Sequence, residues 1–482
     1  GDGASPGHIA WNYDRILARG VNGLIDDHRE ALARTDDPCA QAYYRAVLIC
    51  LDALLEWNRQ HVEALRAMLA RARAPQERAA IEKNLRVMAR VPAEPARTFR
   101  EALQSFYMQW LCVMYEAPYG GNSPGRLDLL LWPYLEPEYA SGRLSYQDAA
   151  ELVAELFIKM DERVHLLDGH VNTIVVGGVR PDGSDAVTPL TTILLDVFEQ
   201  LNLTHPAVYT RVSRVNPAEY VERSVAFMLE GGNRAQILAD EPIIEAMTRG
   251  GRMPFEDAAM YMCGGCMELN PHGKNSDLLF SFVYNLPKTL ELLITGGECL
   301  VSGQQRLSVP GSLRDYATFE AFYAAFVGEM RRTLHAKFRC LDIYSQEMAR
   351  CRPTFLQSSM VDDCLERGKS QQDGGAHYAD YGGTPMGIQN AADSLYALQR
   401  AVYDERFCSA DTLIEALRAD FEGYAALHAR LLAIPKYGLG DPGADGMMAR
   451  LLAEVCRAYD DYTNRHGGRV KPIIFTFVWA PQ

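Results

Sequence analysis

The amino-acid sequence predicts an α/β fold in which a mainly helical layer, residues 1–118, precedes an α/β region, residues 119–482. In the first layer, apolar residues recur three and four positions apart, which is typical of helices that cover a core. From about residue 170 onward, short β-branched strands alternate with helical stretches, which indicates an α/β layer or barrel. No internal repeat, low-complexity tract or long linker interrupts the chain, so we expect a single domain over residues 1–482.

Three segments of the first half carry clear helical signals. Residues 51–69 have apolar positions separated by charged ones, as in an amphipathic helix. Residues 98–117 begin with Thr98 and Glu101, the pattern of a capping box, and then become apolar on nearly every side. A helix of that kind is buried. Residues 145–162 begin with a serine and, three positions later, an aspartate, which predicts a capped helix.

The α/β region is predicted because stretches with apolar residues at strand spacing, every second position, alternate with stretches at helical spacing, every 3.6 positions. Each predicted strand is short, rich in β-branched residues and bounded by turn residues such as the "RPDGSD" stretch. The predicted strands cover residues 171–179, 206–212 and 235–239, and the predicted helices cover residues 189–201, 218–232, 318–338 and 390–405.

The overall charge argues against nucleic acid as a partner. The formal net charge is −14 and the isoelectric point is about 5.3, whereas contacts to phosphates need clustered lysine and arginine. No run of 18 apolar residues is present, so we expect no membrane span. The first residues lack the basic segment and apolar core of a signal peptide.

The chain contains eleven cysteines, scattered from Cys39 to Cys456. An odd number in a large chain fits reduced thiols better than a disulfide framework, which predicts a cytoplasmic protein. We expect most of these cysteines to be small buried side chains.

The stretch "YMCGGCMELNPHGK", residues 261–274, is the most informative part of the sequence. A redox pair of Cys263 and Cys266 is disfavoured, because the residues that follow do not begin a helix that would lower a thiol pKa. A closed zinc site is disfavoured as well, because no second Cys-x-x-Cys supplies the other ligands, so no metal is expected. A tight glycine turn with Cys266 as core filler remains open.

Glu268 favours a catalytic role over that structural turn. In an extended segment, residues two positions apart share a face, so we expect Cys266 and Glu268 to lie side by side. A carboxylate buried beside a thiol costs several kcal/mol unless it is paired or takes part in chemistry. The pair suits a mechanism in which sulfur removes a hydrogen and Glu268 moves a proton.

With these residues, the chain resembles the glycyl radical enzymes, the family related to pyruvate formate-lyase. The resemblance rests on Cys-x-Glu together with further blocks in the order of that family. The blocks cover residues 7–24, 91–107, 122–152, 172–191, 231–241, 374–398, 435–441 and 465–472, including "GHIAWNYDRIL", "GGAHYADYGGTPMG" and "PKYGLGD".

The resemblance implies a ten-stranded α/β barrel built from two five-stranded parallel halves packed antiparallel, here incomplete, with the thiyl loop near residues 263–270. It also implies that a glycyl radical is relayed to Cys266, whose thiyl radical then takes a hydrogen atom from a small substrate. Glu268 matches the glutamate that deprotonates the substrate in dehydratases, C–N and C–S lyases and arylacetate decarboxylases. Adjacent cysteines, the pattern of pyruvate cleavage, are absent because position 265 is glycine.

Weaker candidates surround this pair. Asn122 and Ser123 lie where relatives place polar substrate contacts, with a helix-to-loop turn as the alternative. Asp277 follows the thiol loop and is a candidate for the pocket, although an exposed loop carboxylate is the favoured interpretation. Arg126 and Asp128 match a "GR-x-D" block and are expected to form a structural ion pair.

The resemblance stops short of the radical glycine, which the family carries in an "RV-x-GY" motif. None of the six Arg-Val dipeptides, at residues 86, 90, 163, 211, 214 and 469, is followed by x-Gly-Tyr. The last residues, "GGRVKPIIFTFVWAPQ", predict one more strand. Three explanations stay open: a split enzyme whose partner chain carries the glycine, a portion of a longer protein, and a repurposed paralogue that binds without catalysis.

The sequence therefore predicts the thiyl-bearing part of a glycyl radical lyase, with elimination as the leading reaction and decarboxylation as the alternative. By resemblance, no cofactor is bound in the barrel, and a radical S-adenosylmethionine (SAM) enzyme installs the radical on the glycine of another chain or segment. We expect an oligomer, as is common in the family.

Overall fold

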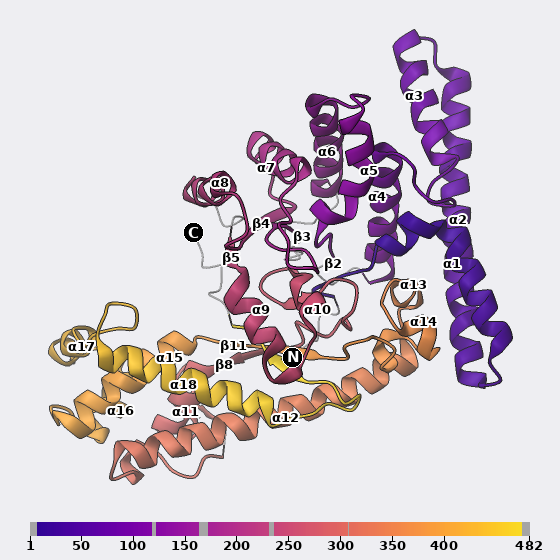
Figure 1. The fold of residues 1–482 in the computed structure, drawn as a ribbon. Helices are drawn as coiled ribbons and strands as arrows, with labels where there is room; N and C mark the ends of the chain where they lie inside the picture. Colours follow the sequence, from indigo (N-terminus) through magenta and orange to yellow (C-terminus); the bar gives the residue numbers. More distant parts are fainter. Residues whose placement is uncertain (1–6, 118–121, 163–171, 231–235, 307, 475–482) are drawn as a thin grey trace. The chain divides into compact units, whose positions relative to one another are not determined.

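The computed structural model describes residues 7–117, 122–162, 172–230, 236–306 and 308–474 (Figure 1). Helices and parallel strands alternate along it, so the predicted α/β class is confirmed. The chain forms two compact units. The larger unit comprises residues 5–280 and 344–381, and the smaller unit comprises residues 1–4, 281–343 and 382–482. The single-domain organisation stays a prediction.

The larger unit contains the helical layer, the main sheet and the thiol loop. Its strands are β1 (Ile9–Ala10), β2 (Asn122–Ser123), β3 (Thr173–Gly177), β4 (Ala207–Val212), β5 (Ile237–Ala239), β6 (Tyr261–Cys263) and β7 (Leu269–Pro271). Its helices are α1 (Asp14–Arg34), α2 (Pro38–Arg71), α3 (Pro75–Met88), α4 (Phe99–Glu116), α5 (Leu127–Ala140), α6 (Tyr146–Asp161), α7 (Pro189–Leu201), α8 (Ala218–Leu229), α9 (Asp240–Thr248), α10 (Phe255–Ala259), α13 (Phe355–Ser358) and α14 (Cys364–Arg367), with 3-10 turns η1 (Arg249–Gly251) and η3 (Gln371–Asp373).

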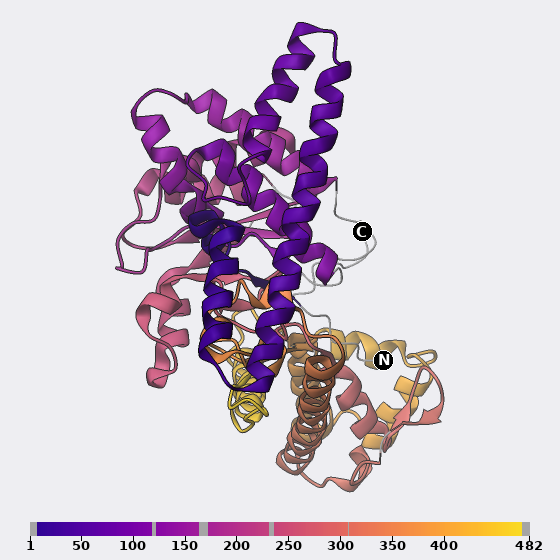
Figure 2. The ribbon, with the colours of Figure 1, turned by 90° about the vertical axis from the view of Figure 1, so that its right-hand side faces the viewer.

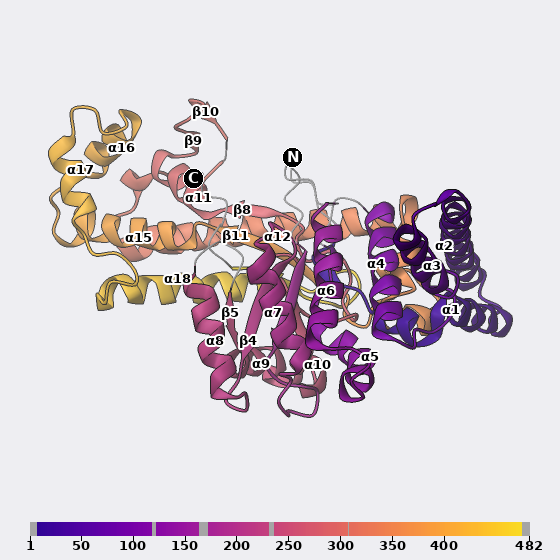
Figure 3. The ribbon, with the colours of Figure 1, turned by 90° about the horizontal axis from the view of Figure 1, so that it is seen from above.

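The main sheet is parallel, with strand order β3-β4-β5. Thr173 pairs with Ala207, and Thr210 pairs with Ile237, so consecutive strands are neighbours. Helices α6, α7 and α8 lie one beside the next, in the same order as strands β3, β4 and β5 (Figures 1 and 3). All five residues of β3 are buried, as expected for a parallel strand that lies inside a protein.

In the helical layer, the long helix α2 packs against α1 and α3 (Figure 2). Helix α4 brings its aromatic residues Phe99, Phe106 and Trp110 into the core, each with no exposed surface. The prediction that residues 98–117 form a buried helix is therefore confirmed.

The predicted capping box of α4 is only half formed. The Thr98 hydroxyl accepts a hydrogen bond from the Glu101 amide at 3.2 Å. The Glu101 carboxylate, however, accepts from the Arg97 amide at 2.9 Å and pairs with the Arg97 and Arg90 guanidinium groups. Two nearby cations attract that carboxylate away from the N-cap amide. Full capping boxes are found at Ser145 of α6 and at Thr188 of α7.

The smaller unit packs helices around a second sheet with strand order β12-β11-β8, in which β11 and β8 are parallel. Helices α15 and α18 run side by side (Figures 1 and 3). Its strands are β8 (Val283–Asn285), β9 (Glu298–Cys299), β10 (Gln304–Gln305), β11 (Tyr381–Met386) and β12 (Val470–Pro472). Its helices are α11 (Leu286–Thr295), α12 (Phe319–Cys351), α15 (Ile388–Leu398), α16 (Ala410–Arg418), α17 (Ala425–Leu432) and α18 (Pro442–Asp460), with the 3-10 turn η2 (Leu313–Asp315) and the π-helical turn η4 (Gln399–Asp404). Helix α12 and strand β11 each include some residues of the larger unit.

Some sequence-based expectations fall partly outside the described residues, namely the glycines at 231–232 that would end α8 and the C-terminal strand beyond residue 474.

All eleven cysteines are free thiols. The expectation that most of them are buried is wrong, because only Cys263, Cys364 and Cys408 are buried. Among the described residues, no helix combines the length and apolar character that crossing a lipid bilayer requires.

Candidate active site

The thiol loop, residues 264–268, connects two antiparallel strands. Tyr261 of β6 pairs with Pro271 of β7, and Cys263 pairs with Leu269. The Gly264 amide donates to the Glu268 carbonyl at 3.1 Å, which closes the loop. Cys263 therefore ends strand β6 and Cys266 lies in the turn, and neither begins a helix. This geometry agrees with the argument against a redox Cys-x-x-Cys pair.

The two glycines of the loop are required by the chain segment that enters β1. A Cβ atom on Gly264 would lie 1.4 Å from the His8 carbonyl oxygen and 2.1 Å from the His8 carbonyl carbon. Gly265 has a φ of +106°, and its Cβ would lie 2.5 Å from Nδ1 of His8. Only glycine leaves room for the His8 backbone and ring against this loop.

Glu268 is fully buried beneath the loop. Its Oε2 accepts a hydrogen bond from the Cys266 amide at 2.8 Å and lies 3.3 Å from Nδ1 of His8. Its Oε1 has no hydrogen-bond partner among the described residues. Cys266 and Glu268 are close together as expected, but the expectation that they share the face of a strand is wrong. Cys266 lies in the turn, and the carboxylate approaches it through its backbone amide.

His8 was not singled out from the sequence, although it belongs to the "GHI" block of the resemblance. Its ring stacks on Phe280 with centroids 4.7 Å apart and an interplanar angle of 21°. The ring is buried, and this stacking holds it against Glu268. A histidine beside a buried carboxylate forms an acid–base pair able to move a proton.

The thiols of the loop are protonated at neutral pH. Burial, followed by the negative charge of Glu268, raises the pKa of Cys266 to about 12. The same causes hold the pKa of the fully buried Cys263 well above its usual range. A thiolate nucleophile or metal ligand needs a lowered pKa, whereas exchange of a hydrogen atom needs an intact S–H bond.

The main sheet forms the wall behind the loop. The Thr173 hydroxyl of β3 donates to the Gly265 carbonyl, which attaches the turn to the sheet. Tyr209 of β4 is buried, and burial, followed by electrostatic interaction with the nearby acidic groups Cys263, Cys266 and Glu268, raises its pKa. Its hydroxyl is therefore neutral, and it shares a hydrogen bond with the Thr173 side chain.

Asn122 and Ser123 form β2, which pairs with β1 beside the loop. Asn122 Oδ1 accepts from the Trp11 indole at 3.2 Å. The Ser123 hydroxyl accepts from the Thr173 amide at 3.2 Å. Both side chains support the strands that carry His8 and the loop, and their contact with a substrate stays a prediction.

Asp277 lies closer to the site than the sequence suggested. The favoured interpretation, an exposed loop carboxylate, is wrong, because Asp277 is only 1% exposed. Its carbonyl accepts from the Gly7 amide at 2.8 Å, next to His8, and its Oδ2 accepts from Gln372 at 3.0 Å. Its Oδ1 has no hydrogen-bond partner among the described residues, and burial raises its pKa to about 7.

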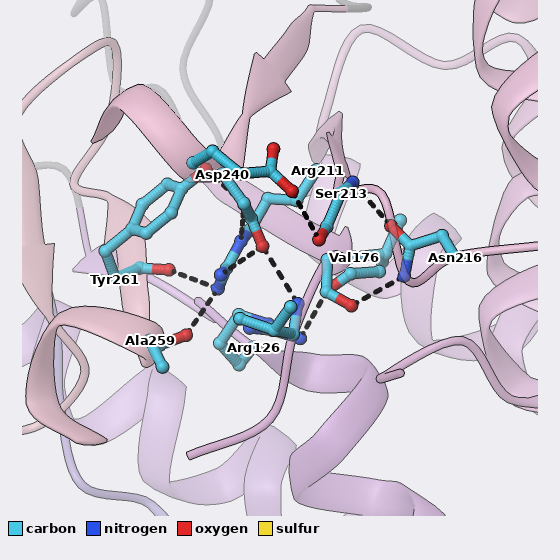
Figure 4. Close-up of polar contacts among 12 residues, drawn as sticks. Arg126, Val176, Arg211, Ser213, Asn216, Asp240, Ala259 and Tyr261 are labelled. Carbon is cyan, nitrogen blue, oxygen red and sulfur yellow. Dashed lines mark hydrogen bonds and ion pairs between the residues drawn. The ribbon is translucent and has the colours of Figure 1, made fainter. Parts of the chain in front are cut away.

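Two buried ion pairs hold the far end of the hairpin, and Figure 4 shows the second of them, between Arg211 and Asp240, beside Tyr261. The predicted structural pair of Arg126 and Asp128 is confirmed, at 3.2 Å with neither side chain exposed. Arg211 forms a bidentate pair with Asp240, both contacts at 2.8 Å. The Tyr261 hydroxyl also donates to Asp240 at 2.8 Å, which anchors the strand that leads to the thiol loop.

Comparison with known proteins agrees with this geometry. The family model described as "Pyruvate formate lyase-like" matches residues 2–479. The chain belongs to this family. Its fold is that of the pyruvate formate-lyase-like glycyl radical enzymes, so the barrel class expected from the resemblance is confirmed.

Individual members of the pyruvate formate-lyase-like family match over most of the chain. Trans-4-hydroxy-L-proline dehydratase of Clostridioides difficile is 30% identical over 485 residues, covering 96% of this chain and 60% of the relative. An isethionate sulfite-lyase of Desulfovibrio desulfuricans is 29% identical over 469 residues, covering 91% and 56%. The glycerol-bound B12-independent glycerol dehydratase of Clostridium butyricum superposes with a TM-score of 0.92 at 26% identity, covering 97% of this chain and 61% of that structure. The chain thus spans about 60% of the length of the relatives it matches.

Proposed function

We propose that this chain is the thiyl-bearing part of a glycyl radical lyase that eliminates water, an amine or sulfite from a small polar substrate. The observation that carries the proposal is the juxtaposition of Cys266 and Glu268. A protonated thiol lies in a turn directly above a fully buried carboxylate that keeps one oxygen unpartnered among the described residues. The activities of the relatives, two dehydratases and a sulfite-lyase, support elimination as the reaction class.

Cys266 supplies the hydrogen-atom chemistry in this proposal. Its thiol gives up a hydrogen atom to a glycyl radical, which leaves a thiyl radical with one unpaired electron on sulfur. The thiyl radical then takes a hydrogen atom from a substrate carbon, so the S–H bond re-forms as the C–H bond breaks. A pKa of about 12 keeps the S–H bond intact at neutral pH, as this exchange requires.

Glu268 supplies the proton chemistry. Its Oε2 is held by the Cys266 amide, so Oε1 is the oxygen that accepts a proton from a substrate hydroxyl. His8, with Nδ1 at 3.3 Å from Oε2, stabilises the carboxylate and positions it. Asp277, with a pKa of about 7, is a second group that can exchange a proton near neutral pH.

The radical glycine and its activation are further parts of the proposal. The glycine lies in a partner chain or in a further segment of the same protein, and a radical SAM enzyme installs the radical. The barrel itself needs no bound cofactor, and the protein works as an oligomer in an anaerobic cytoplasm.

The test begins with anaerobic purification from the native source, followed by intact mass and identification of copurifying chains. We expect an Arg-Val-x-Gly-Tyr segment on the same or an associated polypeptide and, after activation, a glycyl signal in electron paramagnetic resonance. Turnover of small alcohols is then compared between Cys266→Ser and Cys263→Ser. The first substitution should abolish turnover, and the second, at the other end of the loop, should retain it.

Two outcomes contradict the proposal. Turnover that survives Cys266→Ser would exclude the thiyl radical. A chain of this length purified without any radical-glycine segment would leave Cys266 without a radical source, and would favour a repurposed binding protein.

A further inference from the structure

A cavity of the larger unit lies at the end of the β6–β7 hairpin opposite the thiol loop. Its volume is about 390 Å³. Met260, just before β6, and His272, just after β7, line one side, whereas Cys266 lies at the other end of the hairpin. The charged residues around the cavity are Asp14, Arg126, Arg180 and Asp182. None of them takes part in the chemistry proposed for Cys266 and Glu268.

Arg126 brings an unsatisfied donor to this cavity. Its side chain is fully buried; Nε and Nη2 bond to Asp128, and Nη2 also donates to the Gly177 carbonyl at 2.7 Å. Its Nη1 has no hydrogen-bond partner among the described residues. A buried guanidinium nitrogen without an acceptor is costly, and a ligand oxygen would remove that cost.

The neighbouring His272 does not supply the missing acceptor. Its Nδ1 already accepts a hydrogen bond from the Arg126 amide at 3.3 Å. Burial, followed by the positive charge of Arg126, lowers the pKa of His272 to about 4, so the ring is neutral at pH 7. Asp128 is engaged by Nε and Nη2 of Arg126, so a ligand in the cavity that Arg126 lines is the remaining source of an acceptor for Nη1.

Two helices begin at the cavity and add positive potential. Helix α5 starts directly after Arg126, and helix α1 starts at Asp14; neither has a side-chain hydrogen bond at its N-cap. The amide dipoles of such uncapped helix ends favour an anion. Asp14 is the one lining carboxylate on these two helices.

Arg180 provides a second cation at the rim of the cavity. Its Nε donates to the Asp185 carbonyl at 3.0 Å, and no carboxylate of the described residues lies within ion-pair distance of its guanidinium. The lining Asp182 is turned toward the Ser184 amide and hydroxyl, at 3.0 and 2.6 Å. The terminal nitrogens of Arg180 are therefore available for a bidentate contact.

We propose that this cavity binds a small oxyanion, a carboxylate or phosphate group, between Arg126 Nη1, Arg180 and the start of helix α5. The cavity lies at the other end of the hairpin from Cys266. Its residues would bind an anion and take no part in hydrogen-atom transfer, so the proposal goes beyond the lyase function. Asp14 opposes the anion and limits its affinity.

The experiment is isothermal titration of the purified 482-residue chain with sodium phosphate and, separately, with sodium acetate at low ionic strength. Arg180→Ala removes the rim cation of the cavity. Arg214→Ala is the matched control, because Arg214 is an exposed arginine of the same unit that lines a different pocket. Asp14→Asn removes the opposing charge.

We expect saturable binding of at least one anion in the millimolar range. Arg180→Ala should weaken it about tenfold, the effect of losing a charge-assisted contact. Asp14→Asn should tighten it about threefold, and Arg214→Ala should leave it unchanged. Tighter phosphate than acetate would identify the phosphate group as the ligand, and the reverse order a carboxylate. Absence of saturable binding, or equal weakening by Arg180→Ala and Arg214→Ala, would overturn the proposal.

Discussion

Replacement of Gly264 by alanine tests the packing that places Glu268 and His8 together. The added methyl group would lie 1.4 Å from the His8 carbonyl oxygen, 2.1 Å from its carbonyl carbon and 2.8 Å from the Ile9 nitrogen. Carbon atoms in van der Waals contact are about 3.5–4.0 Å apart. The segment before β1 would therefore have to move away from the loop by about 2 Å.

The expected cost follows from the kind of atoms involved. Overpacking a core usually costs about 1–3 kcal/mol, because side chains can rotate and share the strain. Here all three contacts are backbone atoms, and β1 is held by its pairing with β2 at Asn122 and Ser123. We therefore expect Gly264→Ala to lower the free energy of unfolding by at least about 3 kcal/mol.

Urea unfolding monitored by tryptophan fluorescence measures this loss. Four of the five tryptophans, including Trp11 three residues from His8, belong to the larger unit, so the signal reports the unit that contains the loop. With a urea dependence of about 3 kcal/mol per molar, the midpoint should fall by about 1 M.

The matched control is Gly446→Ala in helix α18, where a Cβ would meet no atom within 4 Å. Alanine in an exposed helix interior is favoured over glycine by about 1 kcal/mol, so this substitution in the smaller unit should not lower the urea midpoint that the tryptophans of the larger unit report. If Gly264→Ala unfolds at the same urea concentration as the parent chain, the close approach of His8 to the loop is refuted.

Three further predictions concern charge and protonation. Asp277 has a folded pKa of about 7 against 3.8 in the unfolded chain, so its stabilising contribution is present below pH 3.8 and lost as the pH rises through 7. Asp277→Asn should therefore stabilise the chain by up to about 4 kcal/mol at pH 8 and not at pH 4, measured as urea midpoints; a gain independent of pH would contradict this. Cys266, with a pKa of about 12, should react with iodoacetamide at pH 8 at least about 100-fold more slowly than the exposed Cys39, measured by peptide mass spectrometry; equal rates would contradict a protonated thiol. Asp240→Ala should lower the free energy of unfolding by about 3–5 kcal/mol, because it leaves Arg211 buried without its partner; a loss below about 1 kcal/mol would contradict that view.

Local sequence patterns predicted the elements whose signals are local. Helix α7 covers Pro189–Leu201, the range expected, because Thr188 caps it and its apolar residues have helical spacing. Strand β4, Ala207–Val212, follows from its β-branched residues. Helix α12 extends to Cys351, beyond the predicted residue 338, since no glycine or proline stops it earlier.

The sequence also singled out the two residues on which the proposed site rests. Cys266 and Glu268 stand out because two glycines and a carboxylate surround a thiol within one short stretch. The ion pair of Arg126 and Asp128 was expected from the "GR-x-D" block of the resemblance, and the structure forms it between residues two positions apart.

Only the tertiary structure decided what surrounds that pair. His8 lies 260 positions from Glu268 in the chain, yet its Nδ1 is 3.3 Å from Oε2. Asp277 is buried because Gly7 and Gln372, from distant segments, close over it. Patterns of period 2 or 3.6 carry information about neighbours within a few residues. The burial that raises the pKa of Cys266 and Asp277 depends on which distant segments exclude water, and that is set by the fold as a whole.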